Sequence, residues 1–137
     1  MIACTVLPMS DLDASMRRLI RDELTKPGSD FHHGVETKTD GLIAVVMDDA
    51  VVAGWARTEY WSAGGQMLYD TLEAFVRPER RMQGIAAFAA AGLYTAFLHE
   101  QGGTVAVFSP QMMLVAKRAG FCPTLFERDG NGGWRRA

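Results

Sequence analysis

One short segment, residues 76–86, constrains the fold of this 137-residue chain more than any other, because its order predicts a strand, a loop and a helix start. Val76-Arg77-Pro78 ends a stretch rich in β-forming residues. The turn that follows contains Gly84 and opens a long alanine-rich run. The first turn of a helix has N–H groups without intrahelical partners and carries the positive end of the helix dipole. The segment therefore predicts an anion site, with a cofactor pyrophosphate as the favoured ligand.

The hydrophobic periodicity and the turn signals of residues 1–137 predict a single α+β domain. Strands are predicted at residues 2–7, 42–47, 51–61, 66–76, 104–108 and 121–128. Residues 42–76 are expected to form an antiparallel meander that begins with a hairpin around Asp48-Asp49. Helices are expected from Ser10 until Pro27-Gly28 ends the run, over residues 82–100 and over residues 110–119.

Capping signals mark the predicted helix ends. Ser10 and Asp13 have the spacing of a capping box at the start of the first helix. Ser109 followed by Pro110 favours another helix start, because serine accepts a bond from free N–H groups and proline suits the first helical position. Gly120 suits a left-handed helix end. The alanine-rich helix expected over residues 82–100 has little side-chain volume on one side and can lie close to a sheet.

Composition and charge exclude several classes of function. The chain is 48% hydrophobic and 22% charged, as expected of a globular domain, and its net charge of -2 argues against a surface designed for nucleic-acid backbones. No apolar span or basic leader predicts membrane insertion or export. Cys4 and Cys122 match no metal spacing, so reduced thiols and a cytoplasmic location are expected. His32, His33 and Glu36 are expected to be solvent-exposed, and no metal is predicted.

The series of strand, loop, helix, strand, helix and Gly-Phe resembles the GNAT superfamily of N-acetyltransferases. The family pattern is Val-x-Pro-x-x-(Gln/Arg)-x-x-Gly-x-(Gly/Ala), followed later by a Gly-Phe that closes a short helix. The matching residues are Val76, Pro78, Arg81, Gly84, Ala86, Gly120 and Phe121. The resemblance implies three layers, in which helices flank a mixed, largely antiparallel sheet of six or seven strands that splays between strands 4 and 5.

The resemblance also implies acetyl-CoA as the co-substrate, and transfer of its acetyl group to a primary amine by direct attack. The cofactor-binding residues that it implies are Phe75, Val76, Arg81, Gln83, Gly84, Ile85, Ala86 and Ser109. Glu73 is implied as the general base, with Asp70 as the reserve candidate. Because side chains alternate along a strand, Asp70 and Glu73 are expected to point in opposite directions.

Two departures from the family pattern bear on catalysis. Ala116 stands where the family has a tyrosine that protonates the departing thiolate, and Ser109 stands where it often has an asparagine. Ordered water, Tyr60 or Tyr69 can substitute for the tyrosine. Alternatively, the chain is a non-catalytic acyl-CoA sensor or interaction module. A dinucleotide site at Gly84 is disfavoured, because the three-glycine fingerprint is missing.

The acceptor is predicted only by class. Acidic residues on the expected acceptor side favour a cationic small molecule over a protein: Glu59, Asp70 and Glu73. A polyamine, an aminoglycoside or an amino-acid derivative fits, while a protein amine or an amino-modified nucleobase stays open. Aromatic residues that line the acceptor pocket or belong to the core are Phe31, Trp55, Tyr60 and Trp61. A homodimer through a sheet edge is frequent in the family.

Overall fold

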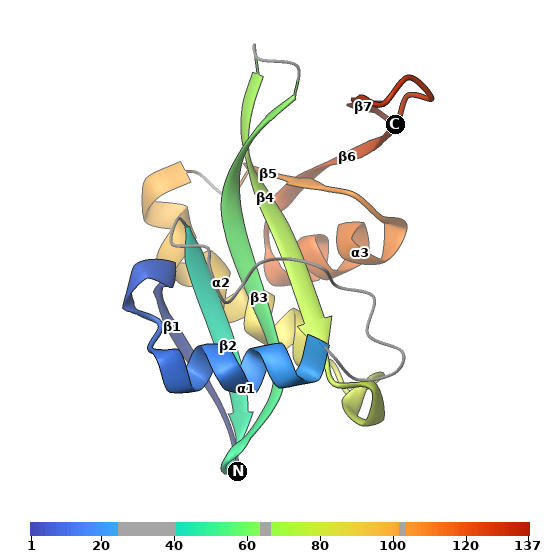
Figure 1. Cartoon of the computed structure of the whole chain (residues 1–137). Coiled ribbons are helices and arrows are strands. Elements are labelled where there is room, and N and C mark those ends of the chain that lie inside the picture. Colours follow the sequence, from blue (N-terminus) through green and yellow to red (C-terminus); the bar gives the residue numbers. More distant parts are fainter. Residues whose placement is uncertain (25–40, 64–66, 102–103) are drawn as a thin grey trace.

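The computed structural model describes residues 1–24, 41–63, 67–101 and 104–137, and the side chains of these except 21–24, 59–63, 67–70 and 97–101 (Figure 1). Across these residues a sheet of seven strands runs in the order β1-β2-β3-β4-β5-β6-β7, with three α-helices. The strands are β1 (Ile2–Pro8), β2 (Leu42–Asp48), β3 (Val51–Ala63), β4 (Met67–Val76), β5 (Thr104–Val107), β6 (Cys122–Arg128) and β7 (Trp134–Arg136). The helices are α1 (Ala14–Leu24), α2 (Ile85–Gln101) and α3 (Pro110–Ala119).

The sheet is mixed and mostly antiparallel, as the sequence predicts. Strands β1 to β4 pair in antiparallel register, which confirms the meander over residues 42–76. β4 and β5 are parallel, with Thr71 opposite Ala106, and β5 and β6 are also parallel. β7 pairs antiparallel with β6 and has no counterpart among the predicted strands.

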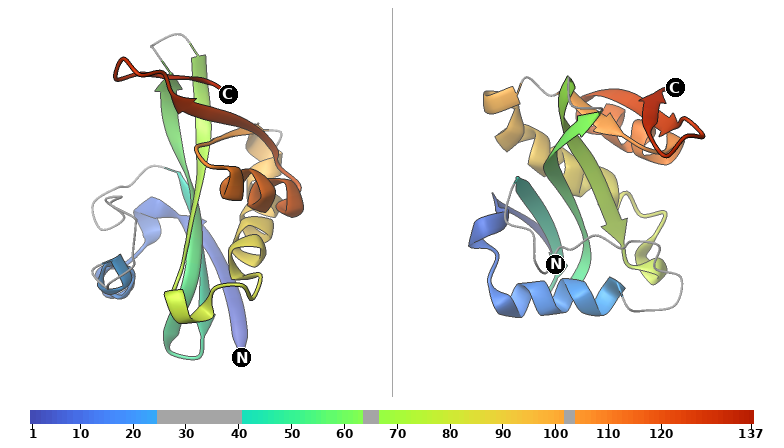
Figure 2. Two further views of the ribbon diagram at one scale, coloured as in Figure 1. Left: turned by 90° about the vertical axis from the view of Figure 1, so that its right-hand side faces the viewer. Right: turned by 45° about the horizontal axis from the view of Figure 1, so that its top comes forward.

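The helices cover the two faces of the sheet unequally. Figure 2 shows α1 on one face and α2 with α3 on the other, so the chain has three layers. The core under α2 and α3 contains Ala89, Ala90 and Leu93 of α2, all fully buried. Gly54 of β3 allows the start of α2 to approach, because an added Cβ would lie 2.9 Å from Ile85 Cγ2. Gly54 of β3 and the alanines of α2 thus let the helix lie close to the sheet, as expected.

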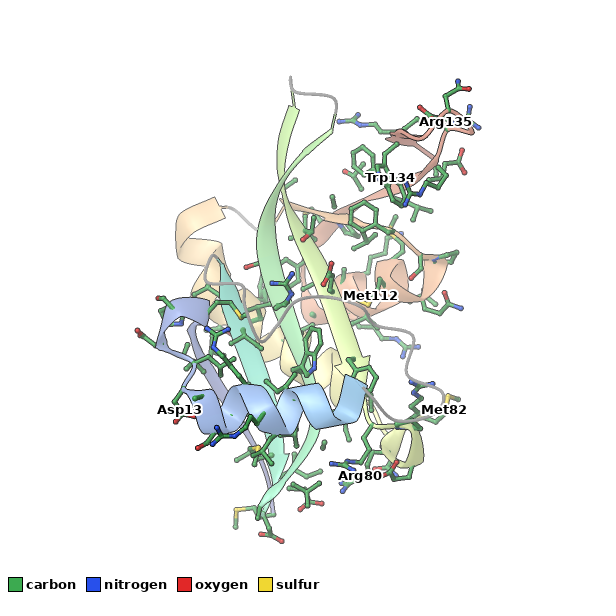
Figure 3. The ribbon with its side chains drawn as sticks, viewed as in Figure 1. Asp13, Arg80, Met82, Met112, Trp134 and Arg135 are labelled. Carbon is green, nitrogen blue, oxygen red and sulfur yellow. The ribbon has the colours of Figure 1, made fainter. Side chains whose placement is uncertain are left out.

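Two predicted helix starts are wrong. Asp13, not Ser10, caps α1, since Met16 N donates to Asp13 Oδ1 at 2.8 Å and Ser10 lies in a 3-10 turn over Met9–Asp11. α2 begins at Ile85 rather than at residue 82. The reason is that Met82 (φ 65°) and Gly84 (φ 76°) adopt left-handed conformations that an α-helix cannot contain. Figure 3 labels Asp13 and Met82 at these two places.

The predicted ends of α3 are confirmed. Met112 N donates to Ser109 Oγ at 3.2 Å, Pro110 is the first helical residue, and Gly120 closes the helix at φ 108°. Phe31, His32, His33 and Glu36 lie outside the described residues. No helix in the described ranges is both long and apolar enough to cross a membrane.

Candidate functional site

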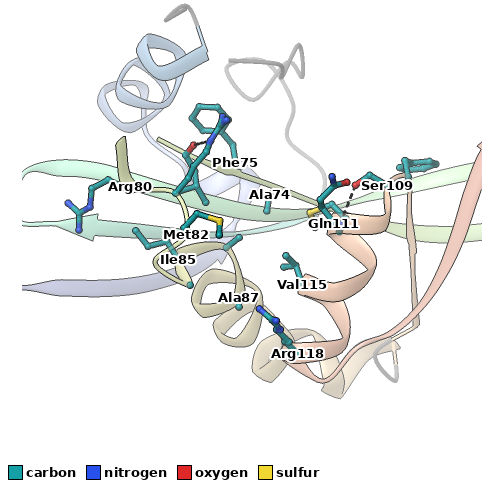
Figure 4. Close-up of a pocket in the computed structure, with 16 residues that line it drawn as sticks. Ala74, Phe75, Arg80, Met82, Ile85, Ala87, Ser109, Gln111, Val115 and Arg118 are labelled. Carbon is teal, nitrogen blue, oxygen red and sulfur yellow. Dashed lines mark hydrogen bonds between the residues drawn. The ribbon is translucent and has the colours of Figure 1, made fainter. Parts of the chain in front are cut away.

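A cleft of about 800 Å³ opens where the end of β4, the first turn of α2 and the start of α3 meet (Figure 4). Most of the predicted cofactor residues line this cleft: Phe75, Val76, Arg81, Gly84, Ile85, Ala86 and Ser109. Gln83 does not line it, and its Oε1 accepts a bond from Arg80 Nε at 3.2 Å. The strand, the loop and two helices thus bring together residues from 74 to 118.

The cleft exists because β5 ends before β4 does. Thr71 lies opposite Ala106, and β5 ends at Val107, whereas β4 continues to Val76. From Ser109 the chain turns into α3 and leaves the plane of the sheet. The C-terminal part of β4, which includes Ala74 and Val76, therefore borders the cleft instead of pairing with β5.

The N-terminus of α2 points its free amides at the cleft. Phe88 N donates to Gly84 O at 2.9 Å, which makes Gly84 the residue where the helical bonding starts. The N–H groups of Ile85, Ala86 and Ala87 belong to the first turn and have no intrahelical acceptor. All three residues line the cleft. A Cβ added at Gly84 would meet no atom within 4 Å, so the backbone is open to a ligand here. This combination is typical of a phosphate site.

The arginines around the cleft differ in how strongly the protein already engages them. Arg80 Nη1 forms an ion pair with Asp48 at 2.7 Å, and this hydrogen bond is the main cause that lowers the pKa of the Asp48 carboxyl. Arg81 Nε donates to Val76 O at 3.2 Å, and its guanidinium lies 6.0 Å from the centroid of the Phe75 ring. Arg81 therefore braces the end of β4 instead of reaching freely toward the start of α2.

Arg118 is the cleft arginine that the sequence analysis missed. It lies in the last turn of α3, its side chain is exposed, and Figure 4 shows it pointing toward Ala87 at the start of α2. Within the described part of the chain it forms no hydrogen bond or ion pair. A signal was available, because Gln111, Val115 and Arg118 recur at helical spacing and all line the cleft. The guanidinium of Arg118 is thus available to an anion at the helix start.

Glu73 lies on the face of β4 that is turned toward α1. Its neighbour Phe75 packs with Trp55 in the core under α1, whereas Leu72 and Ala74 pack under α2. Across the strand pair, Arg57 Nε is 3.3 Å from Glu73 Oε2. Arg57 is fully buried and the Glu73 side chain is 15% exposed. The carboxylate is therefore held by a buried cation, and Glu73 is not among the residues that line the cleft.

The other predicted catalytic groups stand as follows. The backbone of Asp70 lies in β4, but its side chain is outside the described part, so its predicted orientation is not tested. The same holds for the side chains of Glu59, Tyr60, Trp61 and Tyr69. Ala116 is fully buried in the core between α3 and the sheet. No proton donor occupies that position.

Comparison with known proteins gives no family. The chain matches no protein-family model, and no curated protein is significantly similar to it. In the ranges that the structure describes, histidine, cysteine, aspartate and glutamate side chains form no group of three or more able to hold a metal ion. Function is therefore inferred from the cleft and from the two faces of β4.

Proposed function

We propose that the chain is an N-acetyltransferase of the GNAT type, which binds acetyl-CoA in the cleft and transfers the acetyl group to a primary amine. One observation carries the proposal: a strand end, a helix N-terminus and a second helix with a spare cation line the same cleft. The helix N-terminus and the cation suit the pyrophosphate of the cofactor, and the strand end suits the two amides of its pantetheine arm. The face of β4 that carries Glu73 offers a place for the acceptor amine.

The start of α2 suits the pyrophosphate. Its first-turn amides at Ile85, Ala86 and Ala87 line the cleft, and Gly84 leaves space for close approach of an oxyanion. Arg118 supplies a positive charge from the facing helix, and an arginine binds phosphate through directed N–H groups. We propose Arg118, rather than Arg81, as the main charged contact, because Arg81 already donates to the Val76 carbonyl.

The end of β4 suits the pantetheine arm. An extended chain that carries amides can add to a strand edge through backbone hydrogen bonds. The backbone of Ala74 and Phe75 borders the cleft beyond the point where Thr71 lies opposite Ala106. We propose that β4 and β5 splay beyond this pair, so that the thioester reaches the opposite face of the sheet between them.

The chemistry requires little of the protein beyond position and a proton acceptor. The neutral amine attacks the acetyl carbonyl, a C–N bond forms, the C–S bond breaks, and the proton lost by the amine passes to Glu73 directly or through a water. A thiol has an ordinary pKa near 8.5, so the departing thiolate takes a proton from water without a dedicated acid. Arg57 acts as a positioning residue, because its buried guanidinium holds the Glu73 carboxylate in place.

The first test is calorimetric titration with acetyl-CoA. We expect saturable binding, and we expect Arg118→Glu to weaken it by about tenfold or more, because a charged hydrogen bond is replaced by repulsion. Lys117→Glu is the matched control, since Lys117 is the exposed neighbour of Arg118 and does not line the cleft. Equal affinity of the two variants, or no binding by the unaltered chain, would contradict the proposal.

A second candidate function is a non-catalytic acyl-CoA-binding module. The buried Ala116 favours it, because this position offers no acid for the thiolate. Release of free thiol, measured with acetyl-CoA and a panel of primary amines, distinguishes the two functions. Turnover with any amine supports the transferase, whereas saturable binding without turnover supports the module.

A further inference from the structure

The pair of Thr71 and Ala106, beyond which β4 and β5 are proposed to splay, also borders the face of the sheet that carries α1. Thr71 lies opposite Ala106 in parallel register, and two positions later come Glu73 in β4 and Phe108, which follows the end of β5 at Val107. Side chains two apart along an extended chain share a face. The packing agrees, because Phe108 packs with Ala106 whereas Val105 and Val107 belong to the core under α2. A carboxylate and an aromatic ring therefore follow this pair of residues on the α1 side of the sheet.

Phe108 belongs to an aromatic wall that consists of Phe108, Phe126 and Trp134. The ring centroids of Phe108 and Trp134 are 4.9 Å apart, and those of Phe108 and Phe126 are 6.4 Å apart. Phe126 is buried, whereas Phe108 and Trp134 keep part of their surface exposed. Phe108 also lines the cofactor cleft. The wall thus borders the cleft and packs on Ala106, which lies opposite Thr71 of β4.

The β6–β7 hairpin holds Trp134 at this wall. Asp129 Oδ1 accepts bonds from Asn131 N at 2.7 Å and Gly133 N at 3.0 Å, which fixes the turn before Trp134. Figure 2 (left) shows this turn on the side of the sheet that carries α1, and Figure 3 labels Trp134 beside it. The guanidinium of Arg128 lies 4.2 Å from the centroid of the Trp134 ring. The wall is therefore braced, and a guanidinium lies over its Trp134 ring.

We infer that the acceptor is a monoamine carried on an aromatic or flat apolar body, which lays its ring against the aromatic wall and directs its amine to Glu73. The inference rests on the proposed acetyl transfer and narrows its acceptor. Ring contacts at the wall favour an aromatic body. The guanidinium of Arg128, which lies over the Trp134 ring, opposes the second cation of a polyamine at the wall. A polyamine, which the acidic residues in the sequence allow, is therefore expected to be a poor acceptor.

The test compares acetyl transfer to 2-phenylethylamine, n-butylamine and spermidine by the release of thiol. We expect kcat/KM for 2-phenylethylamine to exceed that for the other two by about tenfold or more. Trp134→Leu keeps an apolar side chain but removes the indole, and we expect it to lower the ratio of aromatic to aliphatic kcat/KM by about tenfold. Phe88→Ala is the matched control, because Phe88 is an exposed aromatic residue of α2. It should leave the ratio unchanged.

The outcomes separate this inference from the function on which it rests. Efficient transfer to spermidine or n-butylamine, or a ratio that survives Trp134→Leu, would overturn the inference and leave the transferase in place. Binding of acetyl-CoA without thiol release from any amine would overturn both. Trp134→Phe serves if the leucine variant does not fold, and it should retain most of the preference, because a ring remains at the wall. Preference lost in both Trp134→Phe and Phe88→Ala would also count against the wall.

Discussion

Replacing Glu73 with glutamine removes one charge from an ion pair whose other member, Arg57, is fully buried. The buried guanidinium then faces a neutral amide. Removal of one partner from a buried pair typically costs about 3–5 kcal/mol, because the remaining charge stays out of water. The Glu73 side chain is 15% exposed, and a glutamine oxygen can still accept from Arg57 Nε. We therefore expect the lower end, a loss of about 3 kcal/mol in the free energy of unfolding.

The structure offers a matched control. Glu127 and Arg135 form a pair of similar length across β6 and β7, at 3.1 Å, but their side chains are 48% and 63% exposed. Glu127→Gln should cost no more than about 1 kcal/mol, because water screens and replaces an exposed pair. The two substitutions are chemically identical and differ in burial. Their difference therefore measures what burial adds to the cost.

Urea titration followed by circular dichroism gives the two free energies, and thermal unfolding gives an independent check. For a domain of this size about 1 kcal/mol corresponds to a shift of about 3–5 °C, so Glu73→Gln should unfold about 10 °C earlier. Replacing Arg57 by methionine in the Glu73→Gln background should recover part of the loss, because the buried charge itself is then removed. If Glu73→Gln costs no more than Glu127→Gln, the reasoning about burial is refuted. Acetyl-transfer assays of Glu73→Gln should be run below the temperature at which this variant unfolds. Loss of turnover then reports the missing base and not unfolding.

Two further predictions concern the fold around the site. Gly41→Ala should lower the free energy of unfolding, measured by urea titration, by at least about 3 kcal/mol. Gly130→Ala should lower it by about 1 kcal/mol. Both glycines have φ near 85°, but an added Cβ overlaps a backbone carbonyl of β3 only at Gly41, so equal losses would contradict the packing argument. The folded-state pKa of Asp48 is lowered, so its carboxylate stabilises the fold above the unfolded pKa near 3.9, and this stability is lost as the pH falls through the lower folded value. Asp48→Asn should therefore flatten the decline of the thermal midpoint below about pH 4, and an unchanged decline would argue against the Arg80 contact.

Local chemistry in the sequence predicted the parts of the fold that depend on neighbouring residues. Ser109 and Gly120 close α3 at its two ends as expected, because each acts on backbone groups within one turn. The meander followed from alternation and turn signals for the same reason. The first helix start was wrong because Ser10 and Asp13 both suit a cap, and only the chain's path decides between them.

The sequence by itself determined that a strand, a glycine loop and a helix would meet around Gly84, since each of these features is set by residues adjacent in the chain. The tertiary structure decided which side chains serve the cleft. Arg80 is engaged by Asp48, 32 positions away, and Glu73 by Arg57, 16 positions away, while Arg118 comes from another helix. Such partners depend on which faces of the sheet the strands and helices share, and no short stretch of sequence contains that information.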